Sequence, residues 1–434
     1  MIPHVRRSAC ADPERSIVRH EVVITGVGPI LPNCDDRRTF WHHLRAGQSQ
    51  LAFEQNPADP RVAAPMGRIR DFEPNRYLHG IPERLYERYT RAQLIYLASI
   101  MRAIDDAGIE PSELRTDRVG LFDGTSRDNF DFWHTALRER GPALKKRDLV
   151  VSIPGVSVGV AASLLGVRGP TFTYSCTCTS GAVAIGHALR ELEAGEIDMA
   201  CATGHDAALL PPIYEMYGDA DLLSGERTDA RQAVRPFVEH SKNAFGEGAV
   251  SLILERREHA EARGANILAV LSGFRTGNNG EHPTSIDPGG RRPAELISTL
   301  LRRHGLVPEE IGFVIGHGNG VEASDRSELS YMRLVFGEHA GEVPLLSTKP
   351  IYGHTFGASS ALSVAAAALM LDRQFVAPTV NIHHERSTSG LFHQHGRGQS
   401  RRLGAGLVVA YGMGGQNSVL LLERAREAAE SRAA

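Results

Sequence analysis

The 434-residue sequence predicts a layered α/β protein made of two similar halves. Short apolar strands alternate with amphipathic or Ala-rich helices along the chain, a pattern typical of α/β layers. The segment 105–114 (DDAGIEPSEL) is also similar to 302–311 (RRHGLVPEEI), and each follows a predicted helix and leads into a strand that ends near glycine. An offset of roughly 180–200 residues is too long for a solenoid repeat, which leaves gene duplication or chance similarity as explanations.

Each predicted element has its own local signal. Strands are predicted where β-branched or apolar runs end near glycine, at 22–28, 119–122, 197–202, 312–316 and 406–423. Helices are predicted where apolar residues recur at helical spacing or small residues run without polar surface, at 40–47, 91–107, 182–194 and 358–371. The polar, Gly-rich stretch 276–290 is predicted to be a loop near the seam of the halves, as a lid or a connector.

Composition and charge exclude several classes of protein. The net charge of −3 gives no basic excess for binding nucleic acid or anionic lipid. The longest apolar stretch, 358–371, is shorter than the about 20 residues that cross a bilayer, and the polar residues 1–20 lack the apolar core of a signal peptide. Five irregularly spaced cysteines are typical of a reduced compartment. We therefore expect a cytoplasmic protein with no membrane span and no nucleic-acid partner.

Cys178 is the first candidate for chemistry. It lies where the run TFTYSCTCTSGAVAIGH (171–187) changes from β-favouring residues to small helix formers. A thiol at a helix N-terminus is near the positive end of the helix dipole, which favours the thiolate and predicts a lowered pKa. The alternatives are a buried core cysteine or a metal site with Cys176, although no second cysteine pair would complete a zinc-type site.

Two histidines have similar surroundings to Cys178. His317 follows an apolar strand among glycines, and His354 precedes the buried helix predicted at 358–371. A cysteine nucleophile with histidine partners indicates acyl transfer, and the Gly-rich turn near Met413 could offer a backbone N–H to a developing oxyanion. Other histidines are expected to lie on the surface and not to bind metal, namely His383, His384, His393 and His395.

With these segments in order, the sequence resembles the β-ketoacyl-[acyl-carrier-protein] synthases of the thiolase superfamily over about residues 20–424. The resemblance implies a duplicated five-layer α-β-α-β-α thiolase fold, with one half at 1–270 carrying the nucleophile and the other at 271–434 carrying both histidines. The motifs that support it occur at 22–28, 178–181, 235–237, 246–248, 317–318 with Asp325 and Glu328, Lys349, 353–354, 378–381 and 412–417.

The resemblance also implies a role for each matching residue. Cys178 would be the acylated nucleophile, and His317 and His354 would assist decarboxylation of a malonyl-type thioester. Lys349 would support them in a network with Glu328, and the backbone N–H groups of Cys178 and Met413 would form the oxyanion hole. No metal or redox cofactor is implied, because the carrier protein supplies the pantetheine arm. The implied partners are acyl and malonyl thioesters, an acyl carrier protein and a second ketosynthase-like subunit, in a homodimer or a heterodimer.

The sequence departs from the family pattern around the substrate. Asn319 and Val321 replace threonines that bind the pantetheine arm, and Met413 replaces an aromatic gate near Tyr411. Arg127 lies where the family has small apolar residues near the acyl pocket. We predict that these residues contact substrate and that the pathway is a specialised polyketide or fatty-acid-like one. The alternatives are a non-decarboxylating acyltransferase, the active subunit of a ketosynthase/chain-length-factor heterodimer, or a non-catalytic chain-length partner, which the complete Cys-His-His set disfavours.

Overall fold

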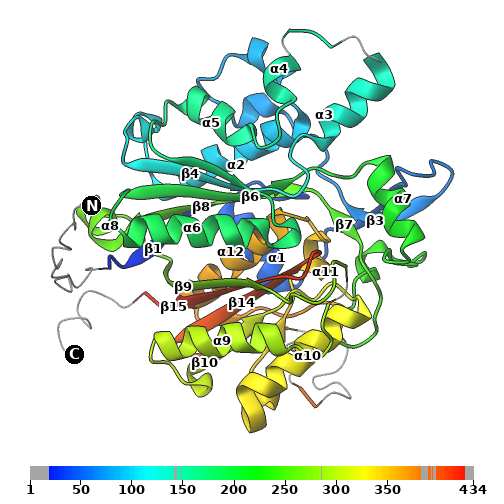
Figure 1. The fold of residues 1–434 in the computed structure, drawn as a ribbon, viewed down its shortest axis with the longest axis vertical. Coiled ribbons are helices and arrows are strands. Elements are labelled where there is room, and N and C mark those ends of the chain that lie inside the picture. The colour runs from blue at the N-terminus through cyan, green and yellow to red at the C-terminus, as the bar shows by residue number, and fades with distance from the viewer. Residues whose placement is uncertain are drawn as a thin grey trace, which may run out of the picture.

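A ten-stranded sheet runs through the molecule (Figure 1). The computed structural model describes residues 19–140, 144–146, 148–284, 286–382, 390–391, 393 and 397–425, so Cys10, His383, His384, His395 and most of the predicted leader and C-terminal tail lie outside the described residues. The ten strands are β1 (Val22–Ile30), β4 (Val119–Gly124), β5 (Thr171–Tyr174), β6 (Met199–Asp206), β8 (Gly248–Arg256), β9 (Ala269–Asn278), β10 (Ile311–Ile315), β11 (Leu345–Leu346), β14 (Ala405–Gly412) and β15 (Gln416–Glu423).

The order of these strands confirms the duplication. One half of the sheet has the order β5-β4-β6-β8-β1, and the other has β11-β10-β14-β15-β9. In the first half β4 is parallel to β5 and β6, while β8 is antiparallel to β6 and β1. In the second half β10 is parallel to β11 and β14, while β15 is antiparallel to β14 and β9. The halves join where β1 pairs with β9, so chance similarity does not explain the repeat.

The helices form three layers around the two half-sheets. The helices α6 (Ser180–Glu193) and α12 (Ala358–Arg373) pack against each other and against strands of both halves, between α2 and α5 on one side and α9 and α10 on the other (Figure 1). Every residue of α12 from 358 to 371 is buried, which agrees with its apolar sequence. The outer helices are α2 (Arg91–Ala107), α5 (Ser157–Leu165), α9 (Arg291–Arg303) and α10 (Glu322–Phe336). The architecture is the predicted five-layer thiolase fold.

The similar segments of the sequence form matching structures. In the first half α2 is followed by the 3₁₀ turn η3 (Pro111–Leu114) and then β4. In the second half α9 is followed by the turn η7 (Pro308–Glu310) and then β10. In both turns a proline occupies the first helical position, where its missing N–H costs no hydrogen bond.

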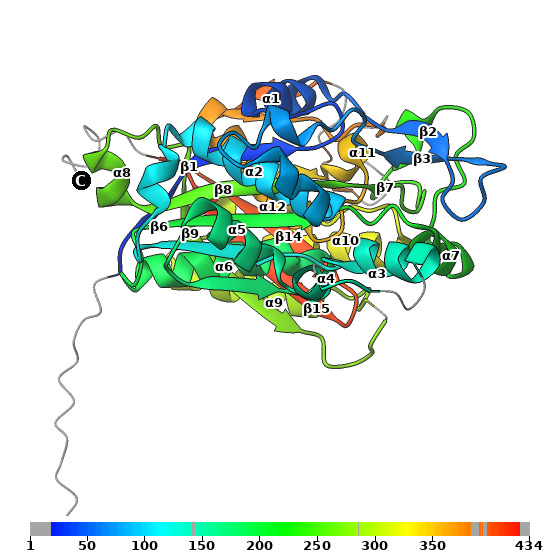
Figure 2. The same cartoon turned by 90° about the horizontal axis from the view of Figure 1, so that it is seen from above.

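The remaining elements surround this core. Both views show β3, β7 and α7 at one end of the molecule and α8 at the other (Figures 1 and 2). Within the described part of the chain, none of the helices has the length and apolar character needed to cross a bilayer. The remaining elements are α1 (Arg37–Ala46), α3 (Phe130–Thr135), α4 (Asp148–Val151), α7 (Pro211–Asp219), α8 (Arg257–Ala262), α11 (Lys349–Tyr352), β2 (Ala52–Gln55), β3 (Ala63–Gly67), β7 (Phe245–Gly246), β12 (Phe375–Val376), β13 (Gln399–Ser400), the turns η1 (Pro74–Arg76), η2 (Glu83–Arg88), η5 (Thr177–Thr179), η6 (Ala230–Gln232) and η8 (Gly337–Gly341), and the π-helical η4 (Ala136–Arg140).

Strand β6 extends four residues beyond its predicted end at residue 202. Three of the four extra residues, Thr203, His205 and Asp206, are polar but buried, because their side chains bond to neighbouring strands or to the loop after β4. Thr203 Oγ1 lies 2.7 Å from Ser251 Oγ, and His205 Nδ1 lies 2.8 Å from Asp123 Oδ1. The prediction from hydropathy alone ended this strand too early, because polar side chains that are hydrogen-bonded to each other can be buried at little cost.

Glycine at position 28 lets β1 approach α2 closely, which gives a stability prediction. A Cβ at Gly28 would lie 2.1 Å from Ser99 O and 2.3 Å from Ala103 N, both backbone atoms of α2. We expect Gly28→Ala to lower the free energy of unfolding by about 2–3 kcal/mol, measured by denaturant titration. The control is Gly159→Ala in α5, where a Cβ meets nothing within 4 Å. An equal effect of both changes would contradict the packing argument.

Candidate active site

A cavity of about 240 Å³ lies where the two halves of the fold meet at the N-terminal ends of the central helices. The predicted nucleophile and both predicted histidines line it together. The described residues that line it are Cys178, Tyr217, Leu222, Asn243, Thr284, Ile286, His317, Asn319, Val321, Ala323, His354, Tyr411, Gly412 and Met413.

Cys178 occupies the turn between a strand and the central helix, as its sequence predicts. Strand β5 ends at Tyr174, η5 contains Cys178, and α6 begins at Ser180. Thr177, just before the nucleophile, has a φ of +53°, a strained conformation for a β-branched residue. The Ser180 hydroxyl stabilises this turn, because it accepts from Cys176 N at 2.9 Å and donates to Thr177 O at 2.6 Å.

His354 is in direct contact with the nucleophile. Its Nε2 lies 3.0 Å from Cys178 Sγ, and its Nδ1 lies 2.8 Å from Ser359 Oγ. The Ser359 hydroxyl can donate to Nδ1 or accept from it, so either tautomer of the imidazole is stable. Burial and the charge of Lys349 hold the pKa of His354 well below its usual value. The residue is therefore a neutral imidazole that can accept the thiol proton at Nε2.

His317 faces the same cavity from the end of β10. Its ring centroid lies 5.4 Å from that of His354, and the two rings are almost perpendicular at 87°. The backbone N–H of Tyr411 points to His317 Nδ1 at 3.5 Å, which favours the proton on Nε2. Burial, with the charge of Lys349, also places the pKa of His317 well below its usual value. His317 is therefore a neutral N–H donor.

Glu328 and Lys349 hold His317 through its backbone. Glu328 accepts from His317 N at 2.8 Å and from Gly318 N at 2.6 Å, while Lys349 Nζ donates to His317 O. Burial raises the pKa of the Glu328 carboxyl and lowers the pKa of the Lys349 ammonium. Neither residue is among the described residues that line the cavity. Their contacts make them positioning residues for His317.

The pKa of Cys178 differs from the prediction. Burial raises it to about 11, against the opposing charges of Lys349 and Arg127. The argument from the helix N-terminus predicted a lowered pKa and is wrong, because loss of water around the thiolate outweighs the dipole. At neutral pH the resting residue is thus a thiol, whose proton must leave as the sulfur attacks. His354 Nε2, at 3.0 Å, is in position to take it.

The predicted substrate residues divide into two groups. Asn319, Val321, Tyr411 and Met413 line the cavity, whereas Arg127 is not among its described lining residues. The Asn319 carbonyl accepts from Val321 N at 3.0 Å and from Ser324 Oγ at 2.5 Å, which leaves its NH₂ group for a ligand. The Tyr411 hydroxyl lies 3.1 Å from Ser327 Oγ, within the core.

Sequence reasoning missed several lining residues. Tyr217 comes from α7, and Asn243 lies just before β7. Thr284 and Ile286 belong to the predicted loop 276–290, which lies on the Gly-rich turn because Gly414 N donates to Pro283 O at 2.8 Å. The position of the loop at the seam was the available signal. No spacing rule linked either segment to Cys178.

The histidines outside the cavity do not suggest a metal centre. In the ranges that the structure describes, no group of three His, Cys, Asp or Glu residues could hold a metal ion. His393 was expected on the surface but is fully buried, with its ring stacked on Phe237 at 5.4 Å between centroids. An aromatic partner distant in sequence accounts for its burial.

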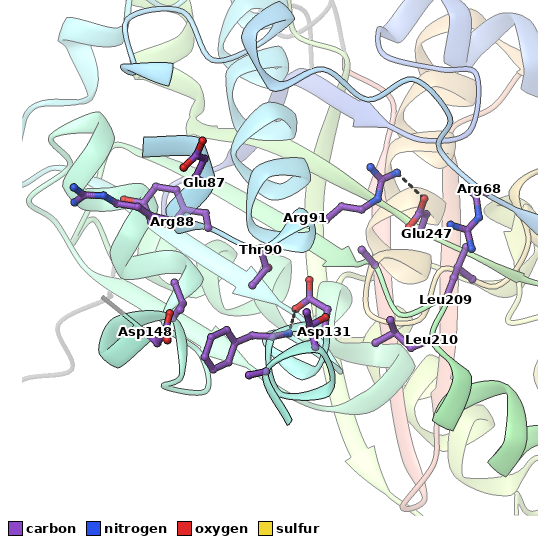
Figure 3. A pocket seen from close by; sticks show the side chains of 16 residues that line it. Arg68, Glu87, Arg88, Thr90, Arg91, Asp131, Asp148, Leu209, Leu210 and Glu247 are labelled. Atoms are coloured by element: carbon purple, nitrogen blue, oxygen red, sulfur yellow. Dashed lines mark hydrogen bonds and ion pairs between the residues drawn. The ribbon is translucent and has the colours of Figure 1, made fainter. Parts of the chain in front are cut away.

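A second cavity of about 370 Å³ lies at the N-terminal end of α2 (Figure 3). Its walls carry charges of both signs, and Arg91 Nη2 donates to Glu247 Oε1 at 2.9 Å. Glu247 also accepts from Ile69 N at 2.9 Å, and burial raises the pKa of Asp131 to about 6. None of the predicted catalytic residues lines this cavity, and its paired charges hold α2 to neighbouring segments.

A cysteine thiol and two neutral imidazoles in a duplicated thiolase fold define a class of acyltransferases that work on thioesters. The chain belongs to the β-ketoacyl synthase family: the family model "Beta-ketoacyl synthase, N-terminal domain" matches residues 19–260, and "Beta-ketoacyl synthase, C-terminal domain" matches residues 268–383. The family resemblance seen in the sequence is thus confirmed, and the protein is an acyltransferase.

Individual relatives come from polyketide and fatty-acid enzymes. A "Putative polyketide beta-ketoacyl synthase 1" of Streptomyces cyaneus is 30% identical over 92% of this chain and 97% of its own length. A "3-oxoacyl-[acyl-carrier-protein] synthase 2" of Synechocystis is 27% identical over 94% of this chain and 99% of its own length. The solved structure "The ishigamide ketosynthase/chain length factor" is 26% identical, with a TM-score of 0.84 over 94% of this chain and 100% of that chain.

Proposed function

We propose that this enzyme loads an acyl group onto Cys178 and condenses it with a malonyl-type thioester on an acyl carrier protein. The observation that carries the proposal is the 3.0 Å contact between Cys178 Sγ and His354 Nε2, with His317 on the same cavity. The product is a β-ketoacyl thioester, in a specialised polyketide or fatty-acid-like pathway. The sequence similarity to polyketide β-ketoacyl synthases and 3-oxoacyl synthases supports this assignment.

The first half-reaction is transfer of the acyl group. Cys178 passes its proton to His354 Nε2 as the sulfur attacks the carbonyl carbon of the donor thioester. The backbone N–H groups of Cys178 and Met413 donate to the oxyanion that forms, in the roles we assign to them. The carbon–sulfur bond to the donor then breaks, and the proton on His354 goes to the departing thiolate.

The second half-reaction forms the new carbon–carbon bond. The Nε2–H groups of His317 and His354 donate to the thioester carbonyl of the malonyl group, since both imidazoles are neutral. The bond to the carboxylate breaks, CO₂ leaves, and its electron pair forms an enolate on the thioester. The enolate carbon attacks the acyl carbon on Cys178, the carbon–sulfur bond breaks, and the cysteine leaves as a thiolate. One proton from solvent returns the thiolate to the resting thiol. Glu328 and Lys349 keep His317 in position throughout.

The mechanism also requires a pantetheine arm and residues that contact it. We assign the pantetheine arm to the carrier protein and no resident cofactor to the enzyme, and we place Asn319 and Val321 along the arm.

A dimer is consistent with β5, which ends the sheet and exposes 45% of Phe172. The likeness to a ketosynthase/chain-length-factor structure supports a heterodimer as well as a homodimer. The four cysteines among the described residues are free, which agrees with the cytoplasm as its location.

The second candidate is acyl transfer without decarboxylation. It is favoured by the residues at the cavity mouth, because Val321 offers no hydrogen bond where the family has a threonine. The domain division at residue 270 is compatible with either function and stays a prediction.

The test measures CO₂ and product together. We expect the purified enzyme, with an acyl thioester and malonyl carrier protein, to release one CO₂ for each β-ketoacyl product. The CO₂ is measured by trapping it as a radiolabelled gas, and the product is measured from the intact mass of the carrier protein. Carrier protein without malonate is the control and should give neither signal. Acyl transfer to an amine or alcohol with no CO₂ release would establish the second candidate instead.

A further inference from the structure

Arg127 lies beside the catalytic cavity, in the loop between β4 and α3. The Tyr217 side chain separates them, because Tyr217 lines the cavity with Cys178 and its hydroxyl contacts the Arg127 guanidinium. The positive charge of Arg127 lowers the pKa of both groups, against the stronger effect of burial, which raises the pKa of Tyr217 to about 12 and that of Cys178 to about 11. A cation therefore lies just beyond the wall that faces the nucleophile.

The loop that carries Arg127 is fixed at both ends. Asp206, at the end of β6, accepts from Arg127 N at 2.9 Å and from Ser126 Oγ at 2.7 Å. Asp128, on the other side, accepts from Gly155 N at 2.8 Å and from the Ser157 hydroxyl. The backbone of Arg127 cannot swing away from the cavity without breaking these bonds.

The guanidinium has few partners of its own. Its Nε is buried without a hydrogen-bond partner among the described residues, and Nη1 reaches only the neighbouring Ser126 O at 3.3 Å. Asp206 is already saturated, because it accepts from Thr125 Oγ1 at 2.9 Å and from Gly357 N at 2.6 Å in addition to the bonds above. A buried donor without a partner is costly, so the site favours an incoming acceptor.

Tyr217 shares the cavity lining with a flexible side chain. The Tyr217 hydroxyl lies 3.7 Å from Met413 Sδ, and both residues line the cavity. A methionine has three rotatable bonds and can move aside for a chain. If an acyl group on Cys178 displaced these two side chains, its far end would lie toward Arg127, which contacts Tyr217.

We propose that Arg127 binds a carboxylate at the far end of the acyl group on Cys178, so that the enzyme selects ω-carboxyacyl chains over alkyl chains. This inference rests on the proposed function of Cys178 as the acylated residue. A guanidinium binds a carboxylate through two parallel hydrogen bonds, whereas an alkyl end would cover the cation and leave its donors unpaired. Arg127 is thus a specificity-determining residue.

The test compares matched pairs of thioesters on the same carrier. The pairs are succinyl with butanoyl, glutaryl with pentanoyl, and adipoyl with hexanoyl, and the measurement is the rate of mass gain at Cys178. We expect the wild type to load the carboxylate-ended member about tenfold faster in at least one pair, the size of one charge-assisted hydrogen bond. Arg127→Leu should reverse that preference, and Arg127→Lys should retain part of it. The control Arg302→Leu changes an arginine on α9 and should keep the wild-type ratio.

The outcomes separate this inference from the proposed function. Faster loading of the alkyl member in every pair, or an unchanged ratio in Arg127→Leu, would overturn the role of Arg127 while leaving Cys178 as the nucleophile. A purely structural role would slow both members of a pair equally, so the ratio distinguishes it from binding. If Arg127→Leu loses its thermal unfolding transition, the ratio in Arg127→Gln decides in the same way. No loading by any thioester would contradict the proposed function itself.

Discussion

Cys178→Ala should lose acyl loading completely. The thiol at position 178 is the nucleophile in the proposed mechanism, and alanine has no atom that could form the thioester. We expect the rate of mass gain with an acyl-carrier thioester to fall by roughly 10³-fold or more, to the level of a reaction without enzyme. The measurement is intact-protein mass spectrometry over time, with peptide mapping of the acylated residue.

Cys176→Ala is the matched control for this experiment. Cys176 lies two residues before the nucleophile, is half-buried and is not among the described residues that line the cavity. Its backbone N–H bonds to Ser180, and alanine keeps that bond. We expect this variant to load like the wild type. Acylation of Cys178→Ala at wild-type rate would show that another residue is the nucleophile.

His317→Ala and His354→Ala should fail at different steps. His354 contacts the Cys178 sulfur, so its loss should slow both loading and condensation. His317 has no contact with the sulfur and presents its N–H to the second substrate, so its loss should leave loading within about threefold while condensation falls by roughly 10²–10⁴-fold. Loading is measured by mass gain on the enzyme, and condensation by CO₂ release.

His339→Ala serves as the control, because His339 is 48% exposed at its side chain and is not among the described residues that line the cavity. It should leave both steps unchanged. If His317→Ala abolished loading and His354→Ala did not, the assignment of the two imidazoles would be reversed. Equal loss in both variants at both steps would mean that the histidines act as one unit from the first step.

The local signals of the sequence predicted most of the fold correctly. Glycine ended the helices where it was expected, with Gly47 and Gly108 both in the left-handed conformation. The Ala-rich stretches became the two central helices because they have no polar face to expose. The same reasoning failed at the end of β6, where Thr203 and His205 are buried by partners that lie on other strands.

The residues that meet in the candidate site could be predicted, but their chemical state could not. Cys178, His317 and His354 stand out because each lies at a junction of a strand or helix among small residues, and the structure brings all three to one cavity. The raised pKa of Cys178 depends on how completely the surrounding layers exclude water, which no single segment encodes. The effect of Arg127 depends on Tyr217 and Asp206, which lie about 80–90 residues further along the chain.

The sequence by itself indicated two similar halves, and it determined that small residues fill the centre of the protein and that a cysteine and two histidines are placed at element ends. These properties follow from hydrophobic periodicity and glycine positions, which act over a few residues. Only the tertiary structure decided that Cys178 and His354, 176 residues apart, lie within 3.0 Å, that both histidines are neutral and that Nε of Arg127 is buried without a partner among the described residues. Burial and electrostatic interaction are set by packing between distant segments, so they exist only once both halves have closed around α6 and α12.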